Sequence, residues 1–211
     1  MSGLFITLEG TEGAGKSSVV PVIEKFFNDE LHKKTICLRE PGGTFIAEKI
    51  RQILKEPCKE EKLCDKSELL LMYAARAQLV ESVIKPKIAE GYVVICDRHD
   101  LSTYAYQGGG RGLPISWIQK VREVALGDFK PNMTLLLDID PIEGMKRARQ
   151  RGELDRFEQE KMDFFNRVRD TYLECAKKDS SIKVIDASKP IDVVQANVLL
   201  EIKEYLKNAT K

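Results

Sequence analysis

Residues 4–17 read Leu-Phe-Ile-Thr-Leu-Glu-Gly-Thr-Glu-Gly-Ala-Gly-Lys-Ser, an apolar run followed by a complete phosphate-binding loop (P-loop). Leu4–Leu8 is short and β-prone, as a buried parallel strand is. From Ser17 to Phe27, apolar and polar residues alternate at roughly helical spacing. The order strand, glycine turn, helix is the context that a P-loop requires. The stretch therefore predicts a nucleoside triphosphate site, the alternative being an ordinary glycine turn before a helix.

The residues of this loop have separate roles in such a site. Its glycines let successive backbone N–H groups point at one anion. Lys16 places a cation on the transferred phosphate, and Ser17 offers a hydroxyl to Mg²⁺. Glu12 is unexpected, because a carboxylate beside a triphosphate is repelled unless it serves a metal, a sugar hydroxyl or an arginine. The residues predicted to bind ATP are Gly10, Thr11, Glu12, Gly13, Ala14, Gly15, Lys16, Ser17 and Ser18.

Length and composition limit the class of protein. The chain has 211 residues and no evident linker, so we expect one α/β domain over residues 1–211. Its 34 basic and 33 acidic residues nearly cancel, and nothing in this balance points to nucleic acid or a membrane as a partner. The sequence shows neither a signal-peptide pattern nor an apolar run of bilayer length, so we expect no membrane-spanning segment.

The cysteines bear on the compartment. Five are scattered along the chain without a C-x-x-C or metal-binding spacing, which favours free thiols in a reducing cytoplasm. Cys37 and Cys96 lie in apolar, strand-like runs, where we expect them to act as small hydrophobic residues.

Strand and helix patterns alternate along the rest of the chain, which predicts an α/β fold with a five-stranded parallel sheet flanked by helices on both faces. The four further strands are expected at Thr35–Leu38, Tyr92–Cys96, Met133–Ile139 and Ile182–Ile185. The further helices are expected at Ala47–Lys55, Lys66–Ala89, Ile115–Leu126, Pro141–Arg151, Gln159–Lys178 and Ile191–Leu206.

Polar residues follow directly on the strands. Ligands bind at the carboxyl ends of parallel strands, so Glu9, Arg39–Gly43, Asp97–Arg98 and Asp138–Asp140 should all lie beside the P-loop. Asp97 suits a role in holding Mg²⁺ or its waters, and Glu9 could act likewise. The alternative for Asp97 is a cap on the following helix.

Arginines recur where a second phosphorylated substrate would lie. Arg39, Arg51, Arg76 and Arg98 stand at strand ends or on nearby helices, and a guanidinium grips phosphate through two parallel hydrogen bonds. For any one of them the alternative is a surface salt bridge.

A basic run at Arg147–Arg156 is the candidate lid, over about residues 141–157. Its cations could meet the charge that develops on a transferred phosphoryl group, unless the run is only a solvated helix end. Gly108–Gly112 does not follow a strand and is expected to be a flexible loop.

The helix expected at Lys66–Ala89 is apolar almost all round, from Leu69 to Ala75. Such a helix needs a second partner besides the sheet. That partner is either another subunit, giving a homodimer, or the interior of the same chain.

Taken together, these motifs resemble those of the bacterial thymidylate kinases, in order from about Gly3 to Ser188. The resemblance implies a nucleoside monophosphate kinase core with a short lid, in a homodimer. It also implies transfer of the γ-phosphoryl group of ATP to dTMP with Mg²⁺, giving dTDP for dTTP biosynthesis. The segments that carry it are Gly10–Ser17, Arg39–Thr44, Asp97–His99, Ser102–Gln107 and Arg147–Arg156.

The resemblance also implies residue roles. Arg51 and Arg98 would bind the dTMP phosphate, Arg76 would donate to thymine O4, and Glu12 would reach the 3′-hydroxyl. Thr103 and Gln107 would face the base, while Tyr106 would crowd the 2′ position and favour deoxyribose. The full dTMP set is Glu12, Arg39, Pro41, Arg51, Met72, Arg76, Arg98, Ser102, Thr103, Tyr106 and Gln107. The metal set is Ser17 and Asp97, and the catalytic set is Lys16, Arg98, Arg149, Arg151 and Glu12.

Two features qualify this picture. The P-loop has no arginine between Gly10 and Lys16, so the sequence resembles the members whose catalytic arginine is in the lid, here Arg149 or Arg151. Met72 stands where the family usually has a phenylalanine that stacks on thymine, which would weaken stacking and could relax base selectivity.

Two other functions compete with this reading. A deoxynucleoside kinase would not need both Arg51 and Arg98 on an acceptor phosphate. A nucleotide-switched binding protein would leave the arginines unexplained, and the base-reading Asn-Lys-x-Asp segment of GTP switches is absent.

Overall fold

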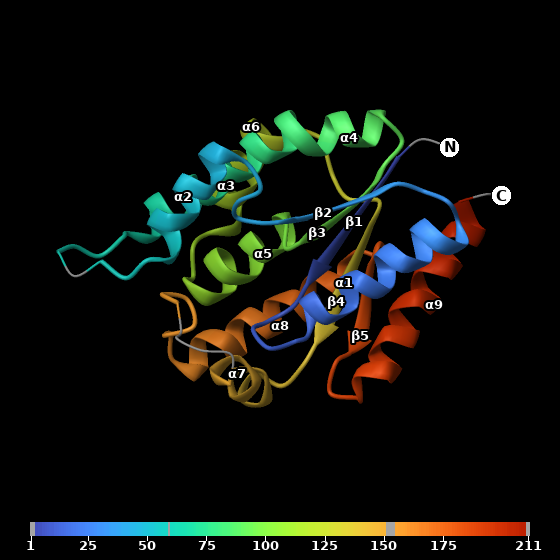
Figure 1. The fold of residues 1–211 in the computed structure, drawn as a ribbon. Helices are drawn as coiled ribbons and strands as arrows, with labels where there is room; N and C mark the ends of the chain where they lie inside the picture. The colour runs from blue at the N-terminus through green and yellow to red at the C-terminus, as the bar shows by residue number, and fades with distance from the viewer. Residues whose placement is uncertain (1–2, 59, 151–154, 210–211) are drawn as a thin grey trace.

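A parallel five-stranded sheet forms the centre of the computed structural model, which describes residues 3–58, 60–150 and 155–209. The strands lie in the order β2-β3-β1-β4-β5 (Figure 1). All four pairings are parallel; Ile6 of β1, for example, lies opposite Ile95 of β3 on one side and Met133 of β4 on the other. The strands are β1 (Leu4–Glu9), β2 (Thr35–Arg39), β3 (Val93–Asp97), β4 (Met133–Asp138) and β5 (Ile182–Asp186). The predicted fold class and strand positions are therefore confirmed to within about a residue.

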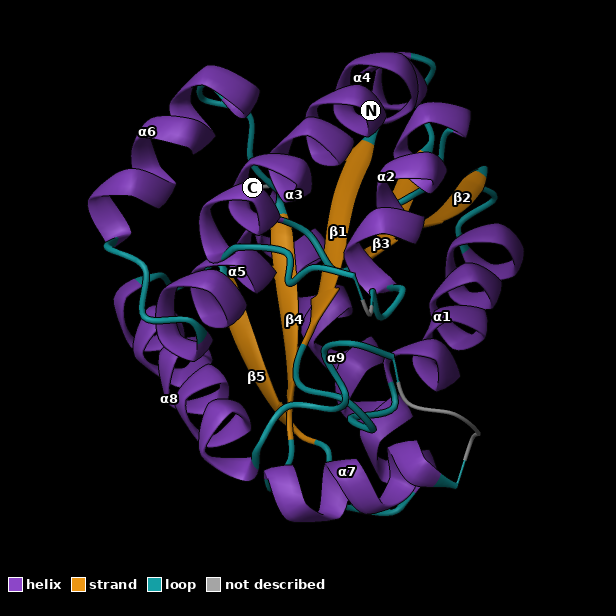
Figure 2. Ribbon diagram, turned by 90° about the vertical axis from the view of Figure 1, so that its left-hand side faces the viewer, coloured by secondary structure: helices purple, strands orange, loops and turns teal. Residues whose placement is uncertain are grey.

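Helices cover both faces of the sheet (Figure 1, Figure 2). Alternate strand residues point to opposite faces, so Ile6 and Leu8 pack with α1 and α9, whereas Phe5 packs with α3 and α6. A third cluster joins β4 to α7, α8 and η3. The α-helices are α1 (Lys16–Lys25), α2 (Phe45–Lys55), α3 (Asp65–Leu79), α4 (Lys85–Ala89), α5 (Asp100–Thr103), α6 (Ile115–Leu126), α7 (Pro141–Arg149), α8 (Met162–Lys178) and α9 (Ile191–Ala209). The π-helical segments are η1 (Phe26–Glu30), η2 (Val80–Ile84) and η3 (Tyr104–Gly110).

The long helix expected at Lys66–Ala89 consists of three contiguous segments, α3, η2 and α4. Pro86 has no N–H to donate, so an unbroken α-helical ladder cannot pass through it. The helix is also not buried all round, since Leu70 is 57% exposed. Glu68 and Arg76, both charged, are instead on its buried side.

The prediction of a flexible loop at Gly108–Gly112 is wrong for Gly108–Gly110. Gly108–Gly110 belong to η3, which packs tightly against α8. A Cβ on Gly109 would lie 2.0 Å from Thr171 Oγ1, and one on Gly110 would lie 2.4 Å from Phe164 Cε2. These glycines therefore permit two helices to approach, a tertiary requirement that the local sequence does not reveal.

Cys96 is buried in the central sheet as expected, but Cys37 is exposed because β2 is an edge strand. Among the described residues, no helix combines the length and the apolar character needed to span a membrane.

Candidate active site

A cavity of about 380 Å³ opens at the carboxyl edge of the sheet. The P-loop forms one side of it, the ends of β2 and β3 form its floor, and α2, α3 and η3 form the opposite side. The predicted site residues that line it are Glu12, Gly13, Ala14, Gly15, Lys16, Ser17, Arg39, Pro41, Arg51, Met72, Arg76, Asp97, Arg98, Ser102, Thr103, Tyr106 and Gln107.

The P-loop is held in a curled conformation at the start of α1. Gly13 has a φ of +70°, and a Cβ there would lie 2.0 Å from the carbonyl oxygen of Gly144 in α7. The Lys16 ammonium curls back and donates to the carbonyl oxygens of Gly10 and Thr11, at 3.0 Å each. Burial, together with the nearby Arg98 cation, lowers the pKa of Lys16. The loop thus presents a cation that a bound anion would stabilise.

Asp97 and Ser17 lie on the wall of the same cavity. The Asp97 Oδ1 atom is buried, and it has no hydrogen-bond partner among the described residues. An unpartnered carboxylate oxygen beside a hydroxyl is the oxygen-donor chemistry that Mg²⁺ or its waters take. Within the described part of the chain, no three His, Cys, Asp or Glu side chains are grouped to hold a metal unaided. A cation here would therefore take part of its ligands from a phosphate substrate.

Arg98 is the most highly connected cation of the site. Its backbone is in the left-handed region, with a φ of +70°, which directs the side chain back over the P-loop. The guanidinium donates to Glu12 Oε1 at 2.7 Å, to Gly10 O at 3.0 Å and to the Tyr106 hydroxyl at 3.0 Å. Although burial opposes its charge, the Glu12 carboxylate raises the pKa of Arg98. Burial alone would raise the pKa of Glu12, but the nearby Arg98 and Lys16 cations lower it to about 2.

Glu9 does not take the metal-binding role that its position after β1 suggested. It is fully buried and accepts hydrogen bonds from the backbone N–H of His99, the Ser102 hydroxyl and the Tyr172 hydroxyl. Burial raises its pKa. Its carboxylate is committed to supporting the loop that follows β3.

Arg51 and Arg39 reach the cavity from the α2 side. Arg51 donates to the Pro41 carbonyl oxygen at 2.7 Å, and burial together with Arg39 lowers its pKa. Arg39 is exposed and pairs with Glu48 at 3.3 Å. Both side chains line the same cavity as the P-loop glycines Gly13 and Gly15.

Arg76 is fixed in the opposite wall by three protein groups. Its Nε donates to Glu40 Oε2 at 2.6 Å, and its two terminal nitrogens donate to Thr103 Oγ1 and His99 O at 2.8 Å each. The side chain of Glu40 also meets His99 Nδ1 at 2.8 Å. Although burial opposes it, the His99 and Arg76 contacts lower the pKa of Glu40. This wall is charged, buried and fixed before any ligand binds.

Several candidate residues lie elsewhere. Three predicted ATP-binding residues neighbour cavity-lining residues in sequence but are not themselves among the described residues that line the cavity: Gly10, Thr11 and Ser18. Arg149 is exposed at the end of α7, away from that wall, and Arg151 lies outside the described residues. Asp138 pairs with Arg169 at 2.7 and 2.8 Å, and Asp140 caps α7. These two acids stabilise local structure instead of lining the cavity.

The basic run is also partly committed to the protein. Arg147 donates to Glu143 and to the Ala187 carbonyl oxygen. Arg156 pairs with Glu68 at 2.7 Å.

Five further residues line the cavity, and sequence reasoning gave them no individual role there. Glu40 belongs to the Arg39–Gly43 stretch expected beside the P-loop, and Asp155 and Phe157 lie within the predicted lid. Phe157 brings an aromatic ring to the wall near Met72 and packs at 6.1 Å from the Tyr106 ring. No local pattern distinguishes Lys55 and Glu158, because contacts distant in sequence place them there. The five residues are Glu40, Lys55, Asp155, Phe157 and Glu158.

A second cavity, of about 420 Å³, begins on the other side of the P-loop. Ala14, Gly15 and Arg147 line it together with the loop between β5 and α9, residues 187–190, and the start of α9. This loop is far from the P-loop in sequence and had not been assigned to the site.

Comparisons with known proteins agree with this geometry. The sequence model described as thymidylate kinase matches residues 8–198. A thymidylate kinase of Shewanella amazonensis is 53% identical over 197 residues, which cover 93% of this chain and 94% of that protein. The crystal structure of the thymidylate kinase from Ehrlichia chaffeensis superposes with a TM-score of 0.77 at 30% identity, covering 96% of this chain and 99% of the other. The chain therefore belongs to the thymidylate kinase family, whose members are enzymes that phosphorylate dTMP with ATP.

Proposed function

We propose that Arg51 and Arg98 hold the phosphate of dTMP in the cavity that the P-loop also lines. The observation that carries this is their placement: both guanidiniums line one cavity with Lys16 and Asp97. Two arginines can fix the acceptor phosphate so that one of its oxygens attacks in line. Glu12, tied to Arg98 at 2.7 Å, is then close enough to the acceptor to serve its 3′-hydroxyl.

The base of dTMP occupies the wall formed by α3 and η3. Arg76 has fixed donors there for thymine O4, and Thr103 and Gln107 face the ring. Met72 and Phe157 supply its apolar surface, and Tyr106 stands at the sugar. Arg39, Pro41 and Ser102 complete the acceptor site.

The γ-phosphoryl group of ATP lies on the P-loop, with its nucleoside in the second cavity beside Arg147. Lys16 neutralises charge on the group in transfer, and the lid, at about residues 141–157 of a single domain over 1–211, adds a cation from Arg149 or Arg151. Ser17 and Asp97 are the residues that would hold Mg²⁺, which lowers the charge on the triphosphate.

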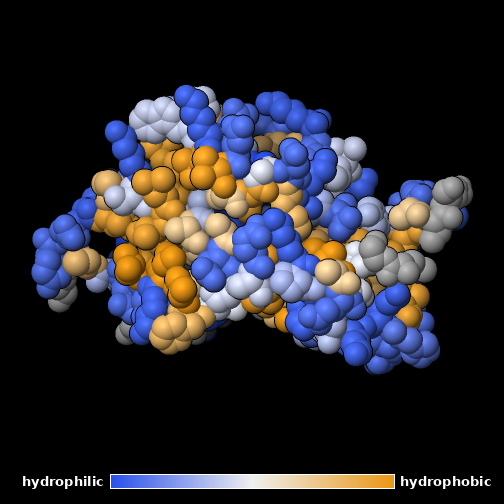
Figure 3. Space-filling model, turned by 90° about the horizontal axis from the view of Figure 1, so that it is seen from above, coloured by the Kyte–Doolittle hydropathy of each residue, from blue (hydrophilic) through white to orange (hydrophobic). Residues whose placement is uncertain are grey.

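We assign a homodimer to the outer face of α2 and α3. Phe45, Ile46 and Ile53 of α2 and Leu70 of α3 are exposed on these neighbouring helices, and Phe45 is 81% exposed. Figure 3, which looks onto this side, shows hydrophobic residues gathered over it. Contiguous apolar surface of this kind marks an interface. Equilibrium sedimentation should give a dimer, and Leu70→Glu should give a monomer.

All five cysteines are free, which fits a reducing cytoplasm as the compartment.

One assay tests the acceptor assignment. ADP release is measured with dTMP, dUMP, dCMP, dGMP, thymidine or no acceptor, for the wild type and for Arg51→Gln and Arg98→Gln. Each substitution should raise the KM for dTMP about tenfold or more while the KM for ATP changes less. Activity with thymidine equal to that with dTMP would contradict a phosphate-binding role for the two arginines. The dUMP to dTMP ratio reports how Met72 affects selectivity.

A metal titration tests the Asp97 assignment. Asp97→Asn should raise the Mg²⁺ concentration that gives half-maximal activity about tenfold or more, because the amide offers one weaker ligand. An unchanged titration would remove Asp97 from the metal site.

A further inference from the structure

Glu68 of α3 is a fully buried carboxylate that the proposed site does not yet use (0% exposed). Its Oε1 accepts from Gln107 Nε2 at 2.7 Å, and its Oε2 accepts from Arg156 at 2.7 Å. The Arg111 guanidinium donates to both oxygens, at 3.2 Å each. A buried carboxylate is costly unless donors satisfy it, and each of these three partners is a donor. We refer to Glu68, Gln107, Arg111 and Arg156 as the Glu68 cluster.

The first link of the cluster sets the orientation of Gln107. An ionised carboxylate only accepts hydrogen bonds, so the amide nitrogen of Gln107 must turn toward Glu68 and its oxygen away. Gln107 is buried, yet it lines the acceptor cavity. A fixed carbonyl acceptor suits a pyrimidine that carries a hydrogen on N3, as thymine does. Cytosine has a lone pair on N3 and cannot donate to it.

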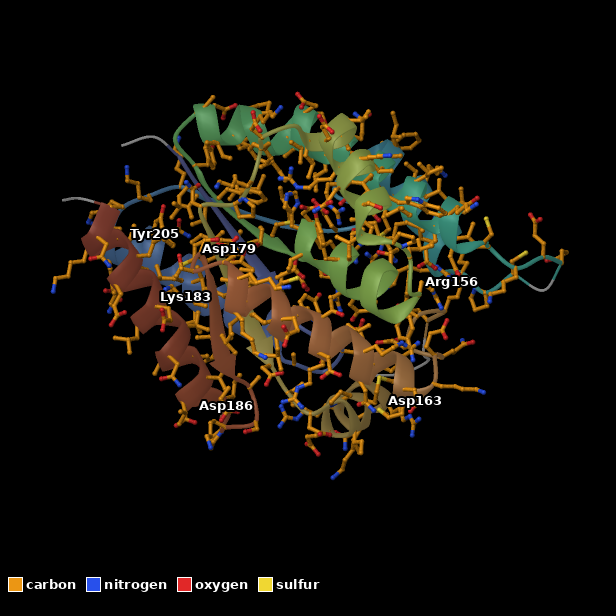
Figure 4. All side chains as sticks on the ribbon, turned by 180° about the vertical axis from the view of Figure 1, so that it is seen from behind. Arg156, Asp163, Asp179, Lys183, Asp186 and Tyr205 are labelled. Atoms are coloured by element: carbon orange, nitrogen blue, oxygen red, sulfur yellow. The ribbon has the colours of Figure 1, made fainter. Side chains whose placement is uncertain are left out.

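The second link reaches residues 155–160, the last residues of the lid and those directly after it, which we call the post-lid segment. Asp155, Phe157 and Glu158 of this post-lid segment line the same cavity. Arg156 lies between them in sequence and is anchored on α2, since its Nε donates to Leu54 O at 2.7 Å. Figure 4 labels Arg156 on the side of the molecule where these elements meet.

Two further contacts hold this segment. Lys55 pairs with Asp155 at 2.5 Å, and Arg111 pairs with Glu160. The Glu68 cluster therefore joins the base wall of the cavity to its post-lid wall through one carboxylate.

We propose that Glu68 is a positioning residue for base recognition: it fixes the Gln107 amide as an acceptor and ties that orientation to the post-lid segment through Arg156. The proposal rests on the dTMP site proposed above. Glu68 reaches the base through Gln107, and it contacts the post-lid wall through Arg156. Substituting Gln107 or Arg156 should therefore change the discrimination between thymine and cytosine.

The test compares Glu68→Gln, Arg156→Gln and the double variant. For each, the KM for dTMP, the KM for ATP and the ratio of kcat/KM for dTMP to that for dCMP are measured. Glu68→Gln should raise the KM for dTMP about tenfold and lower the dTMP to dCMP ratio by a similar factor, leaving the KM for ATP unchanged. Arg156→Gln should shift both quantities in the same direction by less. The double variant should be no worse than Glu68→Gln alone, since one network carries both effects.

Two control variants separate this role from simple loss of stability. Arg169→Gln breaks the ion pair with Asp138 outside the cavity, so it should lower Tm without changing the base ratio. Gln107→Leu reports on the base site itself and must change the ratio if that site is correct. An unchanged ratio in both Gln107→Leu and Glu68→Gln would refute the proposed base site and this inference together. A changed ratio in Gln107→Leu with none in Glu68→Gln would refute the inference alone.

Glu68→Gln leaves two arginines with one carboxylate fewer and could fail to fold. The double variant removes a carboxylate and a cation together, and Arg156→Gln retains Glu68. If only these two are soluble, unchanged base ratios in both overturn the proposal, and lowered ratios in both support it.

Discussion

The two ends of the acceptor cavity are prepared for a ligand in different ways. At the phosphate end, two buried groups keep capacity for a ligand: Asp97 Oδ1 has no partner among the described residues, and Lys16 donates to carbonyl oxygens of its own loop. Arg98 at the same end is already held by Glu12 and Tyr106. At the base end, Arg76 and Glu68 are each satisfied by several protein groups. The first arrangement leaves binding capacity for phosphate and metal, whose charges are large. The second arrangement leaves fewer free groups for a ligand but holds the remaining ones rigidly. Rigid groups discriminate between bases of similar size.

The largest effect should come from removing the cation at the phosphate end. Lys16→Met should lower kcat about 10³-fold or more, because charge on the group in transfer loses its closest compensation. The fold should persist, since the methionine fills a similar buried volume. Steady-state kinetics and thermal melts check this, and a variant with wild-type turnover would contradict the P-loop assignment.

An intermediate effect should follow at the base end. Glu40→Gln leaves the buried Arg76 cation without its main partner, so we expect a loss of about 3 kcal/mol in the free energy of unfolding. The kcat/KM for dTMP should fall about tenfold to a hundredfold with it, because Arg76 is no longer held.

The matched control is Glu48→Gln, which breaks the exposed pair with Arg39 and should cost less than about 1 kcal/mol. Denaturant melts compare the two variants. Equal losses in both would remove the distinction between a rigid base end and a solvated rim.

The smallest effect is a pH dependence at the phosphate end. The pKa of Glu12 is lowered from its ordinary value of about 4.5 to about 2, although burial opposes this, because Arg98 and Lys16 favour its charge. A lowered folded-state pKa gives stability that is present above pH 4.5 and is lost as the pH falls toward 2.

Glu12→Gln should therefore be less stable than the wild type at pH 7, by about 3 kcal/mol, and the difference should shrink between pH 4.5 and pH 2. Urea melts across that range measure the difference, in which the opposite contribution of Glu9 cancels. A gap that stays constant down to pH 2 would mean that Arg98 does not hold the Glu12 charge.

The phosphate end was largely predictable from sequence. P-loop residues 10–17, Asp97 and Arg98 are adjacent to strands, and the carboxyl ends of parallel strands must share one edge. Local pattern and topology thus fixed these residues together before any packing was known. The same reasoning overreached for Glu9 and Asp138, because a strand-end position does not show whether a carboxylate faces the cavity or is taken by Tyr172 or Arg169.

The base end was predictable only in part. The resemblance to the family named Arg76 and Gln107, but not the carboxylates that hold them. The sequence analysis assigned no role to Glu68, which is buried where Arg111 and Arg156 arrive from distant parts of the chain.

By itself, the sequence determined the parallel sheet, the P-loop and the class of chemistry, since strand periodicity, glycine spacing and charged strand ends are local properties. Only the tertiary structure decided that Gly109 lets η3 approach α8 and that Lys55 and Phe157 join the cavity. It also decided which acids bind ligand and which hold arginines. Those outcomes depend on contacts between segments far apart in the chain, and no short window of sequence contains both partners of such a contact.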